Sequence, residues 1–127
     1  TPTALSQARS SLAATSVGDY ALFGGGSTAV DAYNSALTRS TPTALSQARS
    51  SLAATSVGDY ALFGGGYGSG NYYSAVDAYN SALTRSTPTA LSQARDSLAA
   101  TSVGDYALFG GGYKNDTFAV VDAYTLV

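Results

Sequence analysis

Arginine and aspartate recur at equivalent places in this chain, and they are the first residues whose chemistry must be considered. The arginines are Arg9, Arg49 and Arg95, and the aspartates are Asp31, Asp77 and Asp122. Guanidinium and carboxylate groups at repeated positions predict ion pairs within or between units, which we expect to be structural. Acid–base catalysis needs groups whose pKa values differ, and identical copies give no reason for one to differ.

Composition also argues against catalysis and against two classes of partner. The chain has no His and no Cys, so it lacks the commonest general base, the commonest metal ligand and a thiolate. A net charge of −2 with only 11% charged residues gives no attraction for nucleic acid or an anionic membrane. We therefore expect a protein that is not an enzyme, holds no cofactor or metal, and binds neither nucleic acid nor membrane.

The chain is a tandem repeat. The segment TPTALSQARSSLAATSVGDYALFGGG at 1–26 recurs unchanged at 41–66, and recurs at 87–112 with Asp96 in place of a serine. A second shared block, VDAY, follows at 30–33, 76–79 and 121–124. The stretches between the two blocks, 27–29, 67–75 and 113–120, differ in length and sequence. Length variation at one fixed point of a repeat predicts a surface loop.

Each copy predicts four antiparallel strands. Residues 11–17 and the following YALFGG run flank Gly18-Asp19, which is typical of a tight β-hairpin, so Asp19 and its equivalents Asp59 and Asp105 are expected in turns. A third strand is expected at 29–34 and a weaker outer one at 38–45, where Pro42 excludes a central place. Residues 4–14 are the only stretch for which a helix is an alternative.

Glycines end the second strand of every copy. The pairs concerned are Gly24 and Gly25, Gly64 and Gly65, and Gly110 and Gly111. A phosphate-binding loop would need a following Lys-Ser/Thr and a helix, and neither pattern is present. These glycines are therefore interpreted as structural.

The repeat resembles the kelch repeat. Phe23-Gly24-Gly25 is similar to its glycine doublet, Tyr33 to the first aromatic after it, and Arg49 to the arginine that opens the next unit. The same pattern recurs as Phe63-Gly64-Gly65, Tyr79 and Arg95. The chain departs from the family in having no Trp, whose place Leu45 and Leu91 are expected to take.

This resemblance implies an all-β fold of kelch-type β-propeller blades, with three four-stranded antiparallel blades per chain. The expected organisation is a single repeat domain, 1–127, with a spare outer strand at 1–8, blade 1 at 9–48, blade 2 at 49–94, and blade 3 at 95–127 without its outer strand. Propellers have about four to eight blades, so three cannot close a ring. We expect a homodimer in which two chains exchange segment 1–5 to form six blades. The rival interpretation is a fragment of a longer array.

Two functions remain open. Near-identical copies favour a non-catalytic, self-assembling scaffold, natural or designed. Diversified loops favour a module of a bacterial or phage surface protein that binds a glycan or a protein, because Tyr and Asn on a rigid frame suit recognition. The candidate binding residues are Tyr67, Asn71, Tyr72, Tyr73, Tyr113, Lys114, Asn115 and Asp116. The alternative is a purely structural role, in which these loops only cover the edges of the blades.

Overall fold

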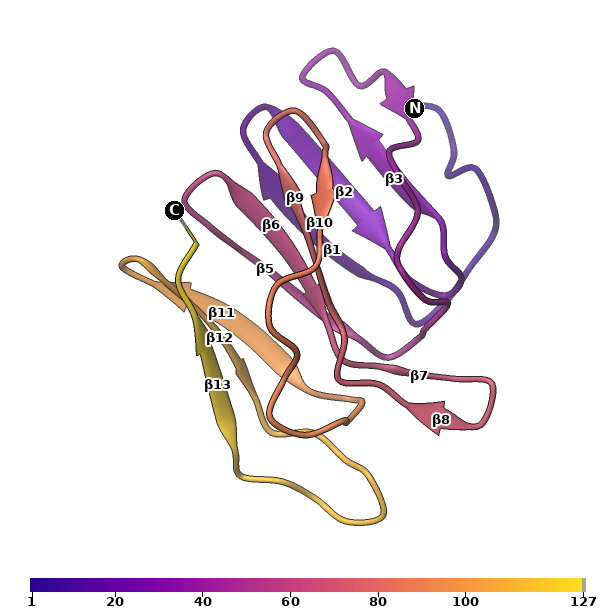
Figure 1. The fold of residues 1–127 in the computed structure, drawn as a ribbon. Coiled ribbons are helices and arrows are strands. Elements are labelled where there is room, and N and C mark those ends of the chain that lie inside the picture. The colour runs from indigo at the N-terminus through magenta and orange to yellow at the C-terminus, as the bar shows by residue number, and fades with distance from the viewer. Residues whose placement is uncertain (127) are drawn as a thin grey trace.

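The fold is all-β and is built from antiparallel sheets. The structure is a computed structural model that describes residues 1–126, and these residues contain strands but no helix. Figure 1 shows three sheets side by side in chain order, the arrangement of a β-propeller-like fold. Residues 4–14, for which a helix is the alternative, contain no helix, and the last two of them begin the first strand.

The sheets correspond to the three copies. Sheet 1 comprises β1 (Ala13–Val17), β2 (Tyr20–Gly24), β3 (Val30–Tyr33) and β4 (Arg39–Ser40). Sheet 2 comprises β5 (Ala53–Val57), β6 (Tyr60–Gly64), β9 (Val76–Asn80) and β10 (Arg85–Ser86). Sheet 3 comprises β11 (Ala99–Val103), β12 (Tyr106–Gly110) and β13 (Val121–Tyr124), and a small hairpin joins β7 (Tyr67–Gly68) to β8 (Asn71–Tyr72).

The predicted first hairpin of each copy is confirmed. Val17 pairs with Tyr20, so Gly18 and Asp19 alone make the turn between β1 and β2. Gly18 has a φ of +55°, a conformation that glycine adopts without steric cost. The same register recurs in β5–β6 and β11–β12, which places the three aspartates in turns as expected.

The expected outer strand, 38–45, is much shorter in the structure. The strand β4 covers only Arg39–Ser40, and its turn forms because the Asn34 side chain accepts the amides of Ala36 and Thr38 at 3.0 Å. Pro42 cannot donate a ladder hydrogen bond, so the chain leaves the sheet before it. Residues 41–45 then cross to sheet 2, where the Tyr79 hydroxyl donates to the Thr43 carbonyl at 2.7 Å.

Segment 1–5, expected as part of a spare outer strand, is not a strand here. It lies on sheet 1 in the way that 41–45 lies on sheet 2. The Tyr33 hydroxyl donates to the Thr3 carbonyl and the Arg39 guanidinium donates to the Ala4 carbonyl, both at 2.7 Å. The tyrosine and arginine that bind the segment belong to the same copy in both sheets, so segment 1–5 is the lead-in of its own sheet.

Neighbouring sheets pack face to face around two hydrophobic cores. The first core joins sheets 1 and 2 and the second joins sheets 2 and 3. The strands β1, β5 and β11 lie next to one another, and the backbone amides of Ser51 and Ser97 donate to the carbonyls of Ser11 and Ser51 at 2.8 Å. These three strands therefore form the inner edge of the assembly, and β4 and β10 form its outer edge. Among the described residues no helix is long and apolar enough to cross a membrane.

Candidate functional site

The repeated arginines and aspartates come together as ion pairs between the start and the third strand of each copy. Arg49 Nη1 lies 3.0 Å from Asp77 Oδ2, Arg95 Nη1 lies 3.0 Å from Asp122 Oδ2, and Arg9 pairs with Asp31. Arg49 and Arg95 also donate to the carbonyls of Phe63 and Phe109 at 3.0 Å. Arg49 and Arg95 therefore hold the lead-in segment against the second and third strands of their own sheets.

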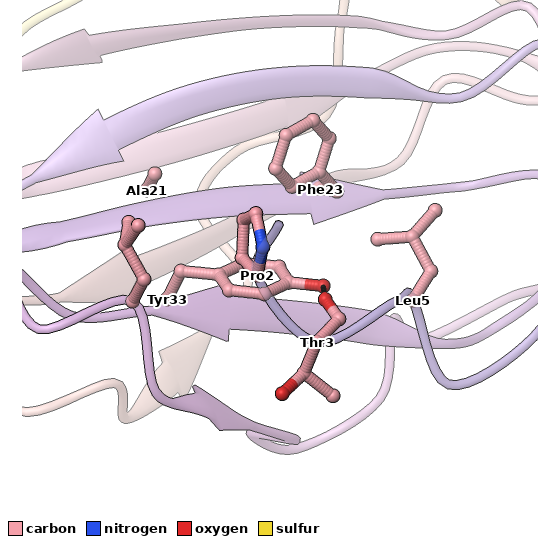
Figure 2. Close-up of a pocket in the computed structure, with 7 residues that line it drawn as sticks. Pro2, Thr3, Leu5, Ala21, Phe23 and Tyr33 are labelled. Carbon is pink, nitrogen blue, oxygen red and sulfur yellow. Dashed lines mark hydrogen bonds between the residues drawn. The ribbon is translucent and has the colours of Figure 1, made fainter.

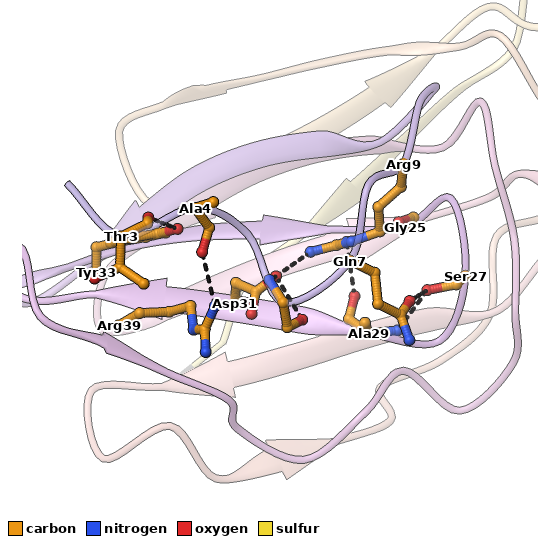
Figure 3. A network of polar contacts seen from close by, with 11 residues as sticks. Thr3, Ala4, Gln7, Arg9, Gly25, Ser27, Ala29, Asp31, Tyr33 and Arg39 are labelled. Carbon is orange, nitrogen blue, oxygen red and sulfur yellow. Dashed lines mark hydrogen bonds and ion pairs between the residues drawn. The ribbon is translucent and has the colours of Figure 1, made fainter. Parts of the chain in front are cut away.

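Asp31 and Asp122 are held as carboxylates. Oδ2 of Asp31 accepts hydrogen bonds from the backbone amide and the hydroxyl of Ser6. It also accepts one from Arg9, as Figure 3 shows. Burial by itself would raise the pKa of Asp31, but these bonds outweigh it and lower that pKa below its ordinary value. Ser92 and Arg95 do the same for Asp122. A carboxylate with a lowered pKa in a structural pair is a poor proton acceptor, so this arrangement suits fixing of the chain better than proton transfer.

The glycine runs use their amides within the fold. The amides of Gly26 and Gly66 donate to the carbonyls of Arg49 and Arg95 at 2.8 Å, and the Gly65 amide donates to Ala75 at 3.0 Å. An anion would need these same donors, so the phosphate-loop alternative has no free amides in the first two copies. Within residues 1–126 no group of three acidic side chains that could hold a metal is found.

The variable loops of copies 2 and 3 bring three tyrosine rings together. The ring centres of Tyr67 and Tyr72 are 4.9 Å apart across the β7–β8 hairpin, and the ring centre of Tyr113 lies 6.3 Å from that of Tyr72. We call these three residues the tyrosine cluster. Tyr67 and Tyr113 are exposed, and burial together with the nearby Asp96 carboxylate raises the pKa of Tyr72.

The other predicted loop residues do not join this cluster through any ring contact. Tyr73 is half-buried and its backbone binds Gly66 and Arg95. Lys114, Asn115 and Asp116 form an exposed tight turn, in which the Lys114 amide donates to the Asp116 carbonyl at 3.0 Å. Asn71 is exposed beside its own turn.

A further candidate, which the sequence argument did not identify, lies on the outward faces of sheets 1 and 3. Between sheets 1 and 2, one half of the core is supplied by Leu22, Val30 and Ala32. The other half is supplied by Leu45, Ala61, Phe63 and Tyr79. The core between sheets 2 and 3 repeats both halves, with Leu62, Val76 and Ala78 against Leu91, Ala107, Phe109 and Tyr124. Each interface thus joins two different sides of the same repeated unit.

The outward face of sheet 3 carries the first of these halves without a partner. We call it the trailing face, and it consists of Val103, Leu108, Val121 and Ala123. Val121 is 59% exposed, whereas Val30 and Val76 at the same position are 1% exposed. Val103 is 62% exposed, against 3% for Val17 and 6% for Val57. A groove of about 450 Å³ lies on this face, bordered by Leu108, Gly110 and Val121.

The outward face of sheet 1 carries the second half. We call it the leading face, and it consists of Leu5, Ala21, Phe23 and Tyr33, the equivalents of Leu45, Ala61, Phe63 and Tyr79. A groove of about 410 Å³ lies on this face, and Pro2 and Leu37 also line it. Figure 2 shows Leu5, Ala21, Phe23 and Tyr33 around this groove. Phe23 and Tyr33 meet edge to face with ring centres 6.0 Å apart, which is the geometry of the buried pair Phe63–Tyr79. The leading face is therefore already ordered as it is in the internal interface.

The glycine at the end of each second strand explains how the faces fit. A Cβ at Gly24 would lie 2.9 Å from the ring of Phe63, and a Cβ at Gly64 would lie 2.9 Å from the ring of Phe109. The same atom at Gly110 would meet only a Val121 methyl at 3.4 Å. No phenylalanine ring packs on Gly110 within residues 1–126, and Phe23 packs on no glycine of a preceding copy.

Comparison with known proteins supports the fold. The sequence matches no protein-family model and no curated protein. Solved structures do resemble it, among them the structure of YjhT, with a TM-score of 0.84 at 15% sequence identity over 97% of this chain. The alignment spans 44% of the YjhT chain, so this chain covers less than half the length of that structure.

Proposed function

We propose that this chain is a non-catalytic scaffold of kelch-type propeller blades that assembles with a second copy of itself into a six-bladed ring. The observation that carries the proposal is the repetition of the internal interfaces on the two open faces. The trailing face has the residues of sheets 1 and 2 that contact the next sheet, and the leading face has the residues that receive them. A surface that packs twice within one chain has the shape and chemistry to pack a third time between chains.

The contact joins unlike surfaces, the leading face of one chain and the trailing face of the other. Such a head-to-tail contact either closes into a ring or continues as a filament. Three blades from each of two chains make six, which lies within the range of about four to eight at which propellers close. Closure buries both open faces of both chains, whereas any open array leaves one of each exposed.

Burial of the apolar side chains on the two open faces would stabilise the pair of chains. Burying an exposed valine or leucine is worth about 1.5–3 kcal/mol. On the trailing face Val103 is 62% exposed and Val121 is 59% exposed, and Phe23 on the leading face adds an aromatic group. Because a closed pair has two such interfaces, the gain counts twice, against a cost of association of about 4–15 kcal/mol.

The route of assembly differs from the strand exchange expected from the sequence. Segment 1–5 is bound to sheet 1 by Tyr33 and Arg39, so donating it would break two hydrogen bonds of the donor. Packing of the faces leaves that segment in place and uses Leu5 as part of the contact surface. Face packing is therefore the form of self-assembly we propose.

The test is the mass in solution as a function of concentration. Multi-angle light scattering or sedimentation equilibrium should give about twice the monomer mass of 12.8 kDa. If the chain stays monomeric to about 100 µM, the proposed six-bladed ring is refuted. A mass that keeps growing with concentration would indicate a filament instead.

A second candidate function rests on the tyrosine cluster. Three adjacent rings, two from the β7–β8 hairpin and one from the neighbouring loop of copy 3, offer flat amphipathic surfaces of the kind that bind a glycan or a protein. Replacing Tyr72 by Ala should abolish binding on a glycan array or in a pull-down while the melting temperature stays nearly constant. Lys114→Ala is the matched exposed control from the neighbouring loop. A large fall in melting temperature for Tyr72→Ala would show that the cluster packs the loops together.

A further inference from the structure

Asp96 is the single position at which the repeated segment 1–26 changes between copies. Copies 1 and 2 carry Ser10 and Ser50 there, and every other position of the segment is identical in all three copies. The change lies next to the tyrosine cluster, because Asp96 and Tyr113 pair through two backbone hydrogen bonds of 3.0 and 2.9 Å. The one change in the repeated frame and the variable loops therefore meet in one place.

The equivalent serine of copy 2 shows what this position does for the fold. The Ser50 hydroxyl donates to the Tyr67 carbonyl at 3.2 Å, beside the backbone pair of the same two residues. An ionised carboxylate at position 96 has no proton to donate to the carbonyl of Tyr113. Within residues 1–126 every ion pair uses another aspartate, and Asp96 is half-buried. The change thus gives up a bond of the frame and leaves a carboxylate without a counter-charge.

The rings beside Asp96 supply the other half of a site for a cation. A cation is attracted to an aromatic ring when it lies within about 6 Å of the ring centre. The centres of Tyr72 and Tyr113 are 6.3 Å apart with their planes inclined by 57°, so one cationic group above the pair lies within that range of both. Burial of Tyr72 and then the charge of Asp96 raise the pKa of that phenol, which places the carboxylate within electrostatic reach of the ring.

A guanidinium group matches this combination of rings and carboxylate better than a sugar does. Its plane stacks on aromatic rings, and its N–H groups bind a carboxylate through two parallel hydrogen bonds. A neutral sugar would stack on the rings but would leave the charge of Asp96 uncompensated, and an acidic sugar would be repelled by it. Every arginine of this chain is already bonded within the fold, in an ion pair or to a backbone carbonyl. The arginine that fits must therefore come from another polypeptide.

We propose that Tyr72, Tyr113 and Asp96 form a binding site for an arginine side chain of a partner protein. The guanidinium stacks over the two rings and donates to the Asp96 carboxylate. Tyr67 meets Tyr72 edge to face at 4.9 Å and holds its ring in place. This inference rests on the second candidate function, binding by the tyrosine cluster, and names the class of ligand.

The test is a titration of the complete ¹⁵N-labelled chain with the peptide acetyl-Gly-Arg-Gly-amide, followed by the amide chemical shifts of Tyr72, Asp96 and Tyr113. So small a ligand should bind with a dissociation constant on the order of millimolar. The same peptide with citrulline for arginine keeps the shape and loses the charge, and it should bind at least about tenfold more weakly. Binding of the arginine peptide should also weaken when NaCl is raised from about 20 to about 500 mM.

Asp96→Ser is the decisive variant, because it restores the residue that copies 1 and 2 carry. Its melting temperature should stay the same or rise, since a serine there can make the bond that Ser50 makes. The arginine peptide should nevertheless bind to it at least about tenfold more weakly. Asp105→Ser is the matched control, because it removes the same charge from the turn at the opposite end of the β11–β12 hairpin, and it should bind as the native chain does.

Three results would each overturn the proposal. They are equal binding of the arginine and citrulline peptides, unchanged binding by Asp96→Ser, and the absence of localised shifts with the arginine peptide at about 50 mM. If a glycan-array or pull-down signal that depends on Tyr72 persists in such a case, the cluster is a binding site for another class of ligand. If that signal is absent as well, the binding function of the cluster fails with the proposal.

Discussion

Adding a side chain at Gly110 should abolish self-assembly while leaving the single chain folded. In Gly110→Val, the new Cβ meets only Val121 within the chain, at 3.4 Å, which is an ordinary contact. In the assembled state the incoming Phe23 ring would approach to about the 2.9 Å seen at Gly24 and Gly64, where no Cβ fits. The substitution therefore separates association from folding.

The size of the effect follows from the number of interfaces. Overpacking a tight contact costs about 1–3 kcal/mol, and a closed pair contains the contact twice, so the loss is about 2–6 kcal/mol. Since about 1.4 kcal/mol is a factor of ten, the dissociation constant should rise roughly 30-fold to 20,000-fold. The stability of the monomer should change by no more than about 1 kcal/mol, because a strand tolerates valine at least as well as glycine.

The assay is sedimentation equilibrium with chemical denaturation of the same samples. Gly64→Val is the matched control, because its Cβ would press on Phe109 inside the chain and should lower the free energy of unfolding even for a monomer. Phe23→Ala should weaken association from the opposite side. If Gly110→Val associates as tightly as the native chain, the assignment of the two faces as partners is refuted.

Three further predictions concern stability. Asp77→Asn should lower the free energy of unfolding by about 3–5 kcal/mol in urea titrations, because it leaves Arg49 buried without its counter-charge; a loss below about 1 kcal/mol would contradict this role. Since the folded pKa values of Asp31 and Asp122 are lowered, their contribution is complete above the unfolded value near 3.9 and disappears as pH falls through the folded values. Melting temperatures should therefore hold from pH 7 to about 5 and fall below about pH 4, and a flat profile to pH 2 would argue against these pairs. Burial raises the pKa of Tyr124 to about 12, so the stability it adds is complete below about pH 10 and disappears towards pH 12; Tyr124→Phe should reduce that alkaline loss, measured by circular dichroism.

Local signals predicted the sheets well and their outer edges poorly. The Gly18-Asp19 turn and the alternating strands around it depend on neighbouring residues, so the sequence was sufficient for the hairpins. The predicted outer strand ran to residue 45, but β4 ends at Ser40, because Pro42 has no amide to continue the pairing. The lead-in segment 1–5 was misplaced for the same reason.

The candidate site was predictable only in part. Repeated Arg and Asp correctly indicated pairs such as Arg49–Asp77, since burying one charge requires the other. The meeting of Tyr72 with Tyr113 could not be predicted, because it depends on how sheets 2 and 3 lie relative to each other. The open faces could have been predicted from the Phe-Gly dipeptide that recurs in every copy. The phenylalanine of one copy packs on the glycine of the preceding copy. The first phenylalanine and the last glycine therefore have no such contact within the described part of the chain.

The hydrogen bonds from Gly26 to Arg49 and from Gly66 to Arg95 have a consequence for how such a protein grows and folds. The loop that ends the second strand of one copy donates these hydrogen bonds to the next copy, so a copy by itself would lack one of its contacts. Each duplication adds one interface along with one copy, and stability should rise with copy number as it does in one-dimensional repeat arrays. A gene segment of this kind can therefore lengthen by whole copies without a new surface having to evolve, since every added copy brings the contact that its predecessor needs.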